Sequence, residues 1–173
     1  MTVMNNKTRA ITLSALFSAL SVIFLYIASV WPTGRFGLTA FSSLFVAAAV
    51  CDAGIIPAVY VFIVSSALGI ILLPDKSAPL LFILFFGYYP VVKYLIERIK
   101  NIALQWGLKI LVFNIALTVL WFLLRSLIIG GGFDAPAILV YIGGNVVFAV
   151  FDYGYSKVIW FYTERVSKKA KRN

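Results

Sequence analysis

The feature that most constrains this chain is a succession of long apolar runs without charged residues. The first run, residues 10–34, contains no charged side chain at all, and about 20 apolar residues are enough for a helix to cross the hydrocarbon core of a bilayer. Hydrophobic residues make up 62% of the 173 residues and charged residues only 12%. Such a chain has too few polar groups to cover its apolar surface in water. The sequence therefore predicts an integral membrane protein.

Turn-forming residues divide the apolar sequence into spans. Pro32 and Gly34 end the first run, 52–54 form a turn, 74–79 form a loop with a proline at each end, and 130–132 are three glycines. We expect a single all-α membrane domain, residues 1–173, with six transmembrane helices at about residues 11–30, 38–51, 55–73, 80–96, 109–129 and 137–162. A short interfacial helix is expected at 102–108, before the fifth span.

The distribution of lysine and arginine predicts the orientation. Twelve of the fifteen basic residues lie at the ends that are cytoplasmic if the N-terminus is inside, whereas the other side holds only Arg35, Lys76 and Arg125. This bias favours a multi-pass protein of the cell membrane with both termini in the cytoplasm. The basic C-terminal tail is interpreted as a topology signal that contacts anionic lipid headgroups, and no nucleic-acid binding is expected.

The residue inventory excludes several kinds of chemistry. The chain has no histidine and a single cysteine, Cys51, which excludes an internal disulfide, metal sites built on histidine or several cysteines, and Ser-His or Cys-His catalytic pairs. We therefore expect no metal, no cofactor and no enzymatic activity. An aspartate pair would require Asp52 and Asp152 to meet, which needs the second and sixth spans to be neighbours.

Polar residues within the last two spans recur at helical spacing. One face of the sixth span carries five residues at this spacing: Tyr141, Asn145, Phe148, Asp152 and Tyr155. One face of the fifth span carries four: Asn114, Thr118, Trp121 and Arg125. Because polar groups are costly at membrane depth, these two stripes are expected to face each other or a shared cavity.

Depth along the helices sorts these residues into two layers. Lys93, Asn114 and Asp152 lie roughly 20 Å or more from the outer surface and form a predicted buried polar cluster. This cluster is interpreted as a buried ion pair that fixes helix packing, with a proton or ion relay as the alternative.

The outer layer predicts a small-molecule site that opens to the outside. It combines polar anchors, aromatic walls and residues of the first loop: Arg125, Asn145, Tyr141, Trp121, Tyr88, Tyr89, Trp31 and Arg35. The guanidinium of Arg125 suits a carboxylate or phosphate. In the alternative, Arg125 reaches the outer headgroups and the aromatic residues form an interfacial belt.

The first helix carries a pair of small residues at helical spacing. Its sequence reads KTRAITLSALFSAL over residues 7–20, and Ala15 and Ala19 permit the close approach of another helix. With six short spans in about 170 residues, the chain resembles the substrate-binding S components of energy-coupling factor (ECF) transporters. The resemblance implies an ECF-like bundle with an outward-facing pocket that captures a vitamin or other small micronutrient. It also implies that Ala15 and Ala19 face a transmembrane coupling (T) subunit, which works with two separate ATPase subunits; this chain has no Walker motif.

A second interpretation belongs to a different class. In size and number of spans the chain also resembles the rod-shape protein MreD, a structural membrane protein of the cell-wall elongation machinery. The polar face would then serve a protein contact and bind no small molecule.

Overall fold

The computed structural model describes the backbone of residues 6–127 and 137–167, and the side chains of residues 7–122 and 138–165. Seven α-helices follow one another in this part of the chain: α1 (Asn6–Val30), α2 (Arg35–Asp52), α3 (Ile55–Leu72), α4 (Ser77–Leu81), α5 (Tyr89–Ile96), α6 (Ile102–Leu127) and α7 (Ala137–Tyr162). A 3-10 turn, η1 (Pro32–Gly34), precedes α2, and two π-helical turns, η2 (Phe82–Phe86) and η3 (Thr163–Ser167), follow α4 and α7. The described residues contain no β-strand.

Six helical segments are long and apolar enough to cross a membrane. Five are α1, α2, α3, α6 and α7, and the sixth is the composite span Ser77–Ile96, in which α4, η2 and α5 follow one another. The protein is thus an all-helical, multi-pass membrane protein. Helices suit this setting because each satisfies its own backbone hydrogen bonds where no water is present.

The start of the fifth span differs from the expectation. Residues 102–127 form the single helix α6, instead of an interfacial helix at 102–108 followed by a separate span. Asn101 caps this helix, because its Oδ1 accepts hydrogen bonds from the backbone N–H groups of Ala103 at 3.0 Å and Leu104 at 3.3 Å. The end expected at residue 129 lies outside the described residues.

The fourth span is interrupted near its middle. The backbone N–H of Gly87 donates to the carbonyl of Phe82 at 2.7 Å, which closes a π-type turn, and a turn at Gly87 and Tyr88 separates η2 from α5. Pro90 explains the break, because a proline has no N–H to continue the helical ladder and its ring clashes with the preceding turn.

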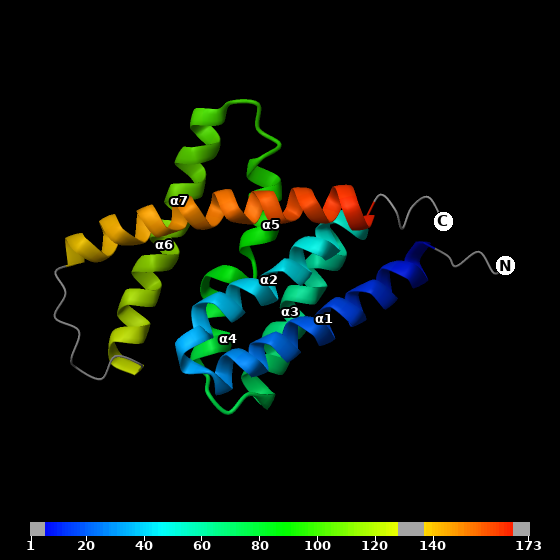
Figure 1. The fold of residues 1–173 in the computed structure, drawn as a ribbon, viewed down its shortest axis with the longest axis horizontal. Helices are drawn as coiled ribbons and strands as arrows, with labels where there is room; N and C mark the ends of the chain where they lie inside the picture. Colours follow the sequence, from blue (N-terminus) through cyan, green and yellow to red (C-terminus); the bar gives the residue numbers. More distant parts are fainter. Residues whose placement is uncertain (1–5, 128–136, 168–173) are drawn as a thin grey trace.

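Helix α2 is the centre of the fold. It packs against α1, α3, α5 and α7, and the small side chains Ala47, Ala48 and Ala49 near its end are buried, which lets the neighbouring helices approach closely. In Figure 1, α1, α2 and α3 run slantwise beside one another, whereas α7 crosses α6 steeply. The hairpin between α5 and α6 projects beyond α7 in the same view.

Two separate clusters of buried side chains form the interior. The larger one joins α1, α2, α3, η2 and α5. The smaller one is aromatic and joins the fourth span to α6 and α7 through Phe85, Tyr89, Ala116 and Phe148. Helix α6 therefore packs in the smaller core, whereas α7 and the fourth span contribute to both.

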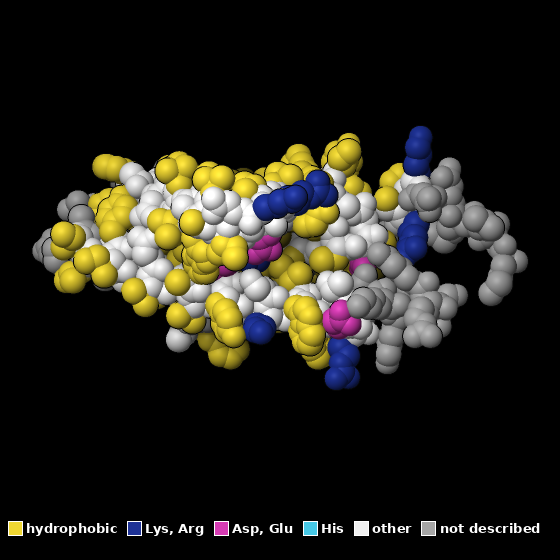
Figure 2. Space-filling model, turned by 90° about the horizontal axis from the view of Figure 1, so that it is seen from above, with side chains coloured by type: hydrophobic (Ala, Val, Ile, Leu, Met, Phe, Trp, Pro, Cys, Tyr) yellow, Lys and Arg dark blue, Asp and Glu magenta, His cyan; other side chains and the backbone are white. Residues whose placement is uncertain are grey.

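The two ends of the bundle differ in composition. At the terminal end, the first turns of α1 lie near the end of α2, and Tyr162 of α7 donates to Asp52 of α2 at 2.5 Å. The distal end holds η1 and the loop between α3 and α4, where Arg35 forms an ion pair with Asp75. In Figure 2 hydrophobic side chains cover much of the visible face, and the drawn charged side chains lie at its middle and toward the terminal end.

Gly87 offers a test of the packing at the helix break. A Cβ atom at this position would approach ring atoms of Phe62 and Phe82 to 2.7 Å, so Gly87→Ala should force both rings to move and destabilise the protein by about 1–3 kcal/mol. Gly107→Ala is the matched control, because a Cβ there meets nothing within 4 Å, and alanine favours a helix. Thermal unfolding in mild detergent measures both variants. Equal melting temperatures for the two variants would contradict the close packing.

Candidate functional site

Four charged side chains form a closed cluster between α5, α6 and α7, which we call the charge quartet: Lys93, Glu97, Lys109 and Asp152. The Nζ of Lys93 donates to Glu97 Oε1 at 2.7 Å and to Asp152 Oδ1. The Nζ of Lys109 donates to the same Glu97 oxygen at 2.8 Å and to Asp152 Oδ2 at 2.9 Å. Each lysine thus bridges both carboxylates. The positive charges of the two lysines balance the negative charges of the two carboxylates.

The charge quartet is largely shielded from solvent. The side chains of Lys93, Asp152 and Lys109 are only 2%, 3% and 6% exposed, whereas that of Glu97 is 41% exposed. Buried charges are tolerated when they are paired and hydrogen-bonded, and an unpaired charge at such a depth is strongly destabilising. Removing α6 or α7 from the cluster would leave such an unpaired charge. Removing α5 would not, because Lys93 and Glu97 leave with it and Lys109 still pairs with Asp152. The quartet therefore ties α6 and α7 to each other and adds contacts to α5.

The buried cluster predicted from the sequence is only partly assembled. The structure brings Lys93 and Asp152 together, but Asn114 bonds elsewhere, and Lys109 and Glu97 complete the cluster instead. Lys109 had been placed at the first residue of the fifth span. Because α6 begins seven residues earlier, at Ile102, Lys109 lies two turns inside the helix, where it reaches Asp152.

A second set of polar contacts joins α6 to α7, and we call it the α6–α7 ladder. The side-chain amides of Asn114 and Asn145 exchange two hydrogen bonds, at 3.0 and 3.1 Å. Thr118 lies one turn after Asn114 on α6, and Tyr141 lies one turn before Asn145 on α7. Their hydroxyl oxygens are 2.7 Å apart. The two polar stripes therefore face each other. Asn145 and Tyr141, which were predicted to bind a ligand, instead bind polar groups of α6.

A large apolar cavity that opens at the surface of the bundle lies between α2, the α4–η2 segment, α6 and α7. Two of the side chains that line it, Phe36 and Val147, are 65% and 68% exposed. Its volume is about 430 Å³. We call it the aromatic cavity because six phenylalanines line it, together with smaller apolar residues: Phe36, Phe85, Phe86, Phe113, Phe148 and Phe151, with Gly37, Ala40, Leu81, Leu117, Leu120, Gly144 and Val147. Phe36 and Gly37 belong to the first turn of α2, so the cavity lies in the distal half of the bundle.

None of the predicted ligand residues whose side chains are described lines the aromatic cavity. Tyr89 lies behind its wall, since its hydroxyl donates to Asp152 Oδ1 at 2.5 Å and its ring packs against Phe85 and Phe148 at centroid distances of 5.0 and 5.6 Å. Tyr88 packs edge-on against Phe62. Trp31 is exposed, Trp121 is half-buried, and the side chain of Arg125 lies outside the described residues.

Apart from Phe148, which the helical spacing of the sixth span picked out, the phenylalanines of the cavity gave no signal in the sequence. A buried phenylalanine that lines a cavity and one that faces lipid have the same apolar character, so hydropathy and spacing do not distinguish them. Polar and interfacial residues in the sequence indicated the contacts between α6 and α7, but they did not indicate the aromatic cavity beside these helices.

No family model, curated protein or solved structure matches the chain. The function must therefore be argued from the contacts and cavities themselves.

The first-loop arginine predicted for the ligand site forms a distal ion pair. Arg35, at the start of α2, binds Asp75, whose carboxylate also accepts hydrogen bonds from the backbone N–H and the hydroxyl of Ser77 at 2.9 and 2.8 Å. Partial burial raises the pKa of Asp75, but the bonds from Ser77 and the charge of Arg35 outweigh it and bring the pKa below its ordinary 3.8.

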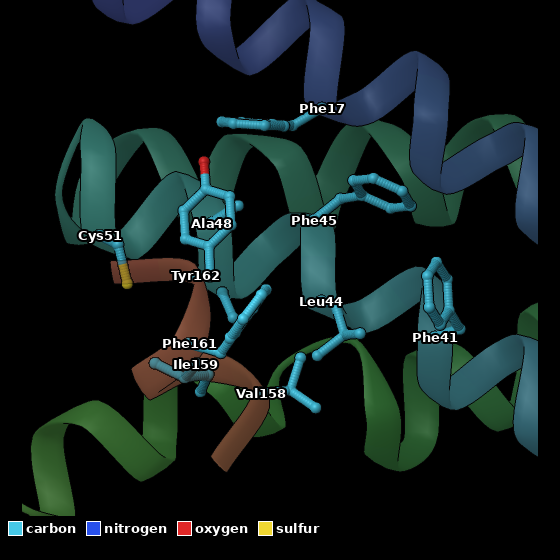
Figure 3. Close-up of a pocket in the computed structure, with 11 residues that line it drawn as sticks. Phe17, Phe41, Leu44, Phe45, Ala48, Cys51, Val158, Ile159, Phe161 and Tyr162 are labelled. Atoms are coloured by element: carbon cyan, nitrogen blue, oxygen red, sulfur yellow. The ribbon is translucent and has the colours of Figure 1, made fainter. Parts of the chain in front are cut away.

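A smaller apolar groove lies between α1, α2 and the last turns of α7 (Figure 3). Its volume is about 270 Å³, and Phe17, Phe45 and Tyr162 project into it from these three helices. Ala15 and Ala19, the pair predicted to contact a partner, do not line this groove and are exposed on the surface of α1.

The two aspartates that could have formed a pair lie apart in the structure. Helices α2 and α7 are neighbours, but Asp52 binds Tyr162 whereas Asp152 lies ten residues earlier on the same helix, which separates the two carboxylates by about 15 Å along α7. No group of three potential metal ligands occurs in the described part of the chain.

The charge quartet predicts an asymmetric response to neutralisation. Asp152→Asn leaves two buried lysines facing a single carboxylate, so the variant should lose about 3–5 kcal/mol of stability. Glu97→Gln is the matched control and should lose clearly less, because Glu97 is 41% exposed and polar surroundings can compensate. Thermal unfolding in mild detergent compares them. Equal losses in the two variants would show that burial does not govern the quartet.

The distal ion pair predicts a pH-dependent contribution. Because the pKa of Asp75 is lowered in the folded state, the stabilisation is present above the unfolded pKa and is lost as the pH falls through the folded one. Asp75→Asn keeps an oxygen for Ser77 but removes the charge that binds Arg35. At neutral pH the variant should have a lower melting temperature, and its free energy of unfolding should be smaller by less than about 1 kcal/mol, since the pair is partly exposed. As the pH falls through the lowered pKa of Asp75 in the folded protein, the two proteins should converge. A difference that is constant with pH would contradict this account.

Proposed function

We propose that this protein is the solute-binding membrane subunit of a multi-subunit importer, similar to the S components of ECF transporters. The observation that carries this proposal is the aromatic cavity of about 430 Å³ between α2, η2, α6 and α7. Its volume falls in the range of roughly 300–1,000 Å³ that is typical of small-molecule sites. The captured solute is a vitamin or another small micronutrient.

The cavity favours a binding role over a purely structural one. Protein interiors are packed about as densely as organic crystals, and empty space next to large side chains is destabilising. A scaffold protein similar to MreD would gain nothing from a cavity walled by six phenylalanines. The polar stripes of α6 and α7, which such a scaffold would use for a protein contact, bind each other instead.

The surface of α1 supports the second part of the proposal, a contact with a coupling subunit. Ala15 and Ala19 are exposed one turn apart, so the backbone of another transmembrane helix can approach closely. With both termini in the cytoplasm, as the basic residues favour, the cavity in the distal half lies toward the outside of the cell membrane. Two ATPase subunits bound to the coupling subunit would power release inside.

Native mass spectrometry of the tagged protein, purified from its own cells in mild detergent, tests both parts together. The wild type should carry a small solute and co-purify with a hydrophobic coupling subunit and two ATPase chains. Ala15→Leu/Ala19→Leu should lose these partners yet keep the solute, because the side chains are remote from the cavity. Ala67→Leu, at an exposed alanine of α3, is the matched control and should keep both.

The outcomes separate the two classes of function. Co-purification with cell-wall elongation proteins and no solute would replace the importer by a scaffold similar to MreD. A retained solute with the same partners in wild type and Ala15→Leu/Ala19→Leu would leave solute binding intact and reject the proposed docking face.

A further inference from the structure

We propose that the aromatic cavity takes an uncharged molecule with a planar aromatic ring, and that it excludes anionic solutes. This inference rests on the proposed solute-binding function and specifies its ligand. It departs from the expectation, based on Arg125, that the ligand is anchored by a carboxylate or phosphate.

Among the described residues, the lining of the cavity offers nothing to a charge. Every described residue that lines it is apolar. A charge moved into such surroundings without a partner loses its hydration and gains no ion pair or hydrogen bond in return. An apolar cavity with these walls stays dry and binds apolar rings, as engineered cavities in soluble proteins bind benzene.

Several polar side chains beside the lining are already bound within the protein. Asn114 and Asn145 follow Phe113 and Gly144 in the chain, yet their amides exchange hydrogen bonds across the α6–α7 ladder. The hydroxyl of Tyr89, behind the cavity wall, donates to Asp152. A ligand that recruited any of these groups would have to break a contact that holds the bundle together.

The arrangement of the rings favours an aromatic ligand over an aliphatic one. Phe113 and Phe148 are stacked, with centroids 4.5 Å apart and planes 11° from parallel. Phe85 meets both rings edge-on, at interplanar angles of 75° and 71°. These are the two arrangements that aromatic pairs prefer, so a planar ring in the cavity extends the set.

A lipid acyl chain has no comparable reason to enter. In a bilayer the chain is already surrounded by apolar groups, so moving it into the cavity brings no hydrophobic gain, and it lacks the quadrupole that rewards ring packing. The cavity therefore selects aromatic molecules from a membrane that surrounds it with aliphatic ones.

Naphthalene and 2-naphthoate, which share a ring system and differ in charge, are the probes for this inference. With the protein in nanodiscs and empty nanodiscs subtracted, naphthalene should bind at least about tenfold more tightly than 2-naphthoate, because burial of the carboxylate is uncompensated. Decane, as the aliphatic probe, should show no saturable binding.

Two glycine variants show whether the binding occurs in this cavity. Gly37 lines the cavity, and a Cβ there meets nothing within 4 Å. Gly37→Leu should fill the space and weaken naphthalene binding by about tenfold or more. Gly143→Leu, at an α7 glycine with equally open surroundings that does not line the cavity, is the matched control and should leave binding unchanged.

Each other result overturns the inference in a recognisable way. Tighter binding of 2-naphthoate than of naphthalene would show that a cationic group contacts the ligand, which would overturn the inference. The importer proposal would survive this result if native mass spectrometry found a charged solute bound to the protein. Saturable decane binding lost in Gly37→Leu would make the occupant an acyl chain. Naphthalene binding that persists in Gly37→Leu would place the ring elsewhere. Absence of every probe and of any co-purified solute would reject the solute-binding function itself.

Discussion

The arrangement of α5, α6 and α7 depends on the charge quartet. In a bilayer the hydrophobic effect does not drive helices together, because lipid tails are as apolar as leucine side chains. Polar contacts between helices therefore decide which partners meet. Lys93, Lys109, Glu97 and Asp152 balance one another across three helices. Separating α6 or α7 would leave a charge unpaired in an apolar medium.

The quartet also sets one wall of the aromatic cavity. Asp152 accepts a hydrogen bond from the hydroxyl of Tyr89. The ring of Tyr89 packs against Phe85 and Phe148, which line the cavity. The α6–α7 ladder fixes the same two helices at a second level. The polar faces of α6 and α7 thus hold the helices in place, while their apolar faces and the interrupted fourth span enclose the space in which we propose that a solute binds.

The candidate site could be predicted only where charge was involved. Lys93 and Asp152 stood out in the sequence because an ionised side chain within an apolar run needs a partner. Lys109 did not, since a lysine at the presumed start of a span has water and headgroups available, and only the continuous helix from Ile102 places it deeper. Asn114 had been grouped by depth with the lysine, but its amide finds a complementary amide in Asn145. The phenylalanines of the cavity were not predictable from an apolar pattern.

The sequence by itself determined that the chain is a bundle of six membrane-spanning helices and where most of them begin and end. That information is local, because uncharged runs of sufficient length must form helices in lipid, and prolines and glycines interrupt them. Only the tertiary structure decided which polar groups pair and where space remains. Pairing depends on the rotation and crossing of helices that are distant in the chain, and a cavity is the volume that their side chains leave unfilled, which no single helix specifies.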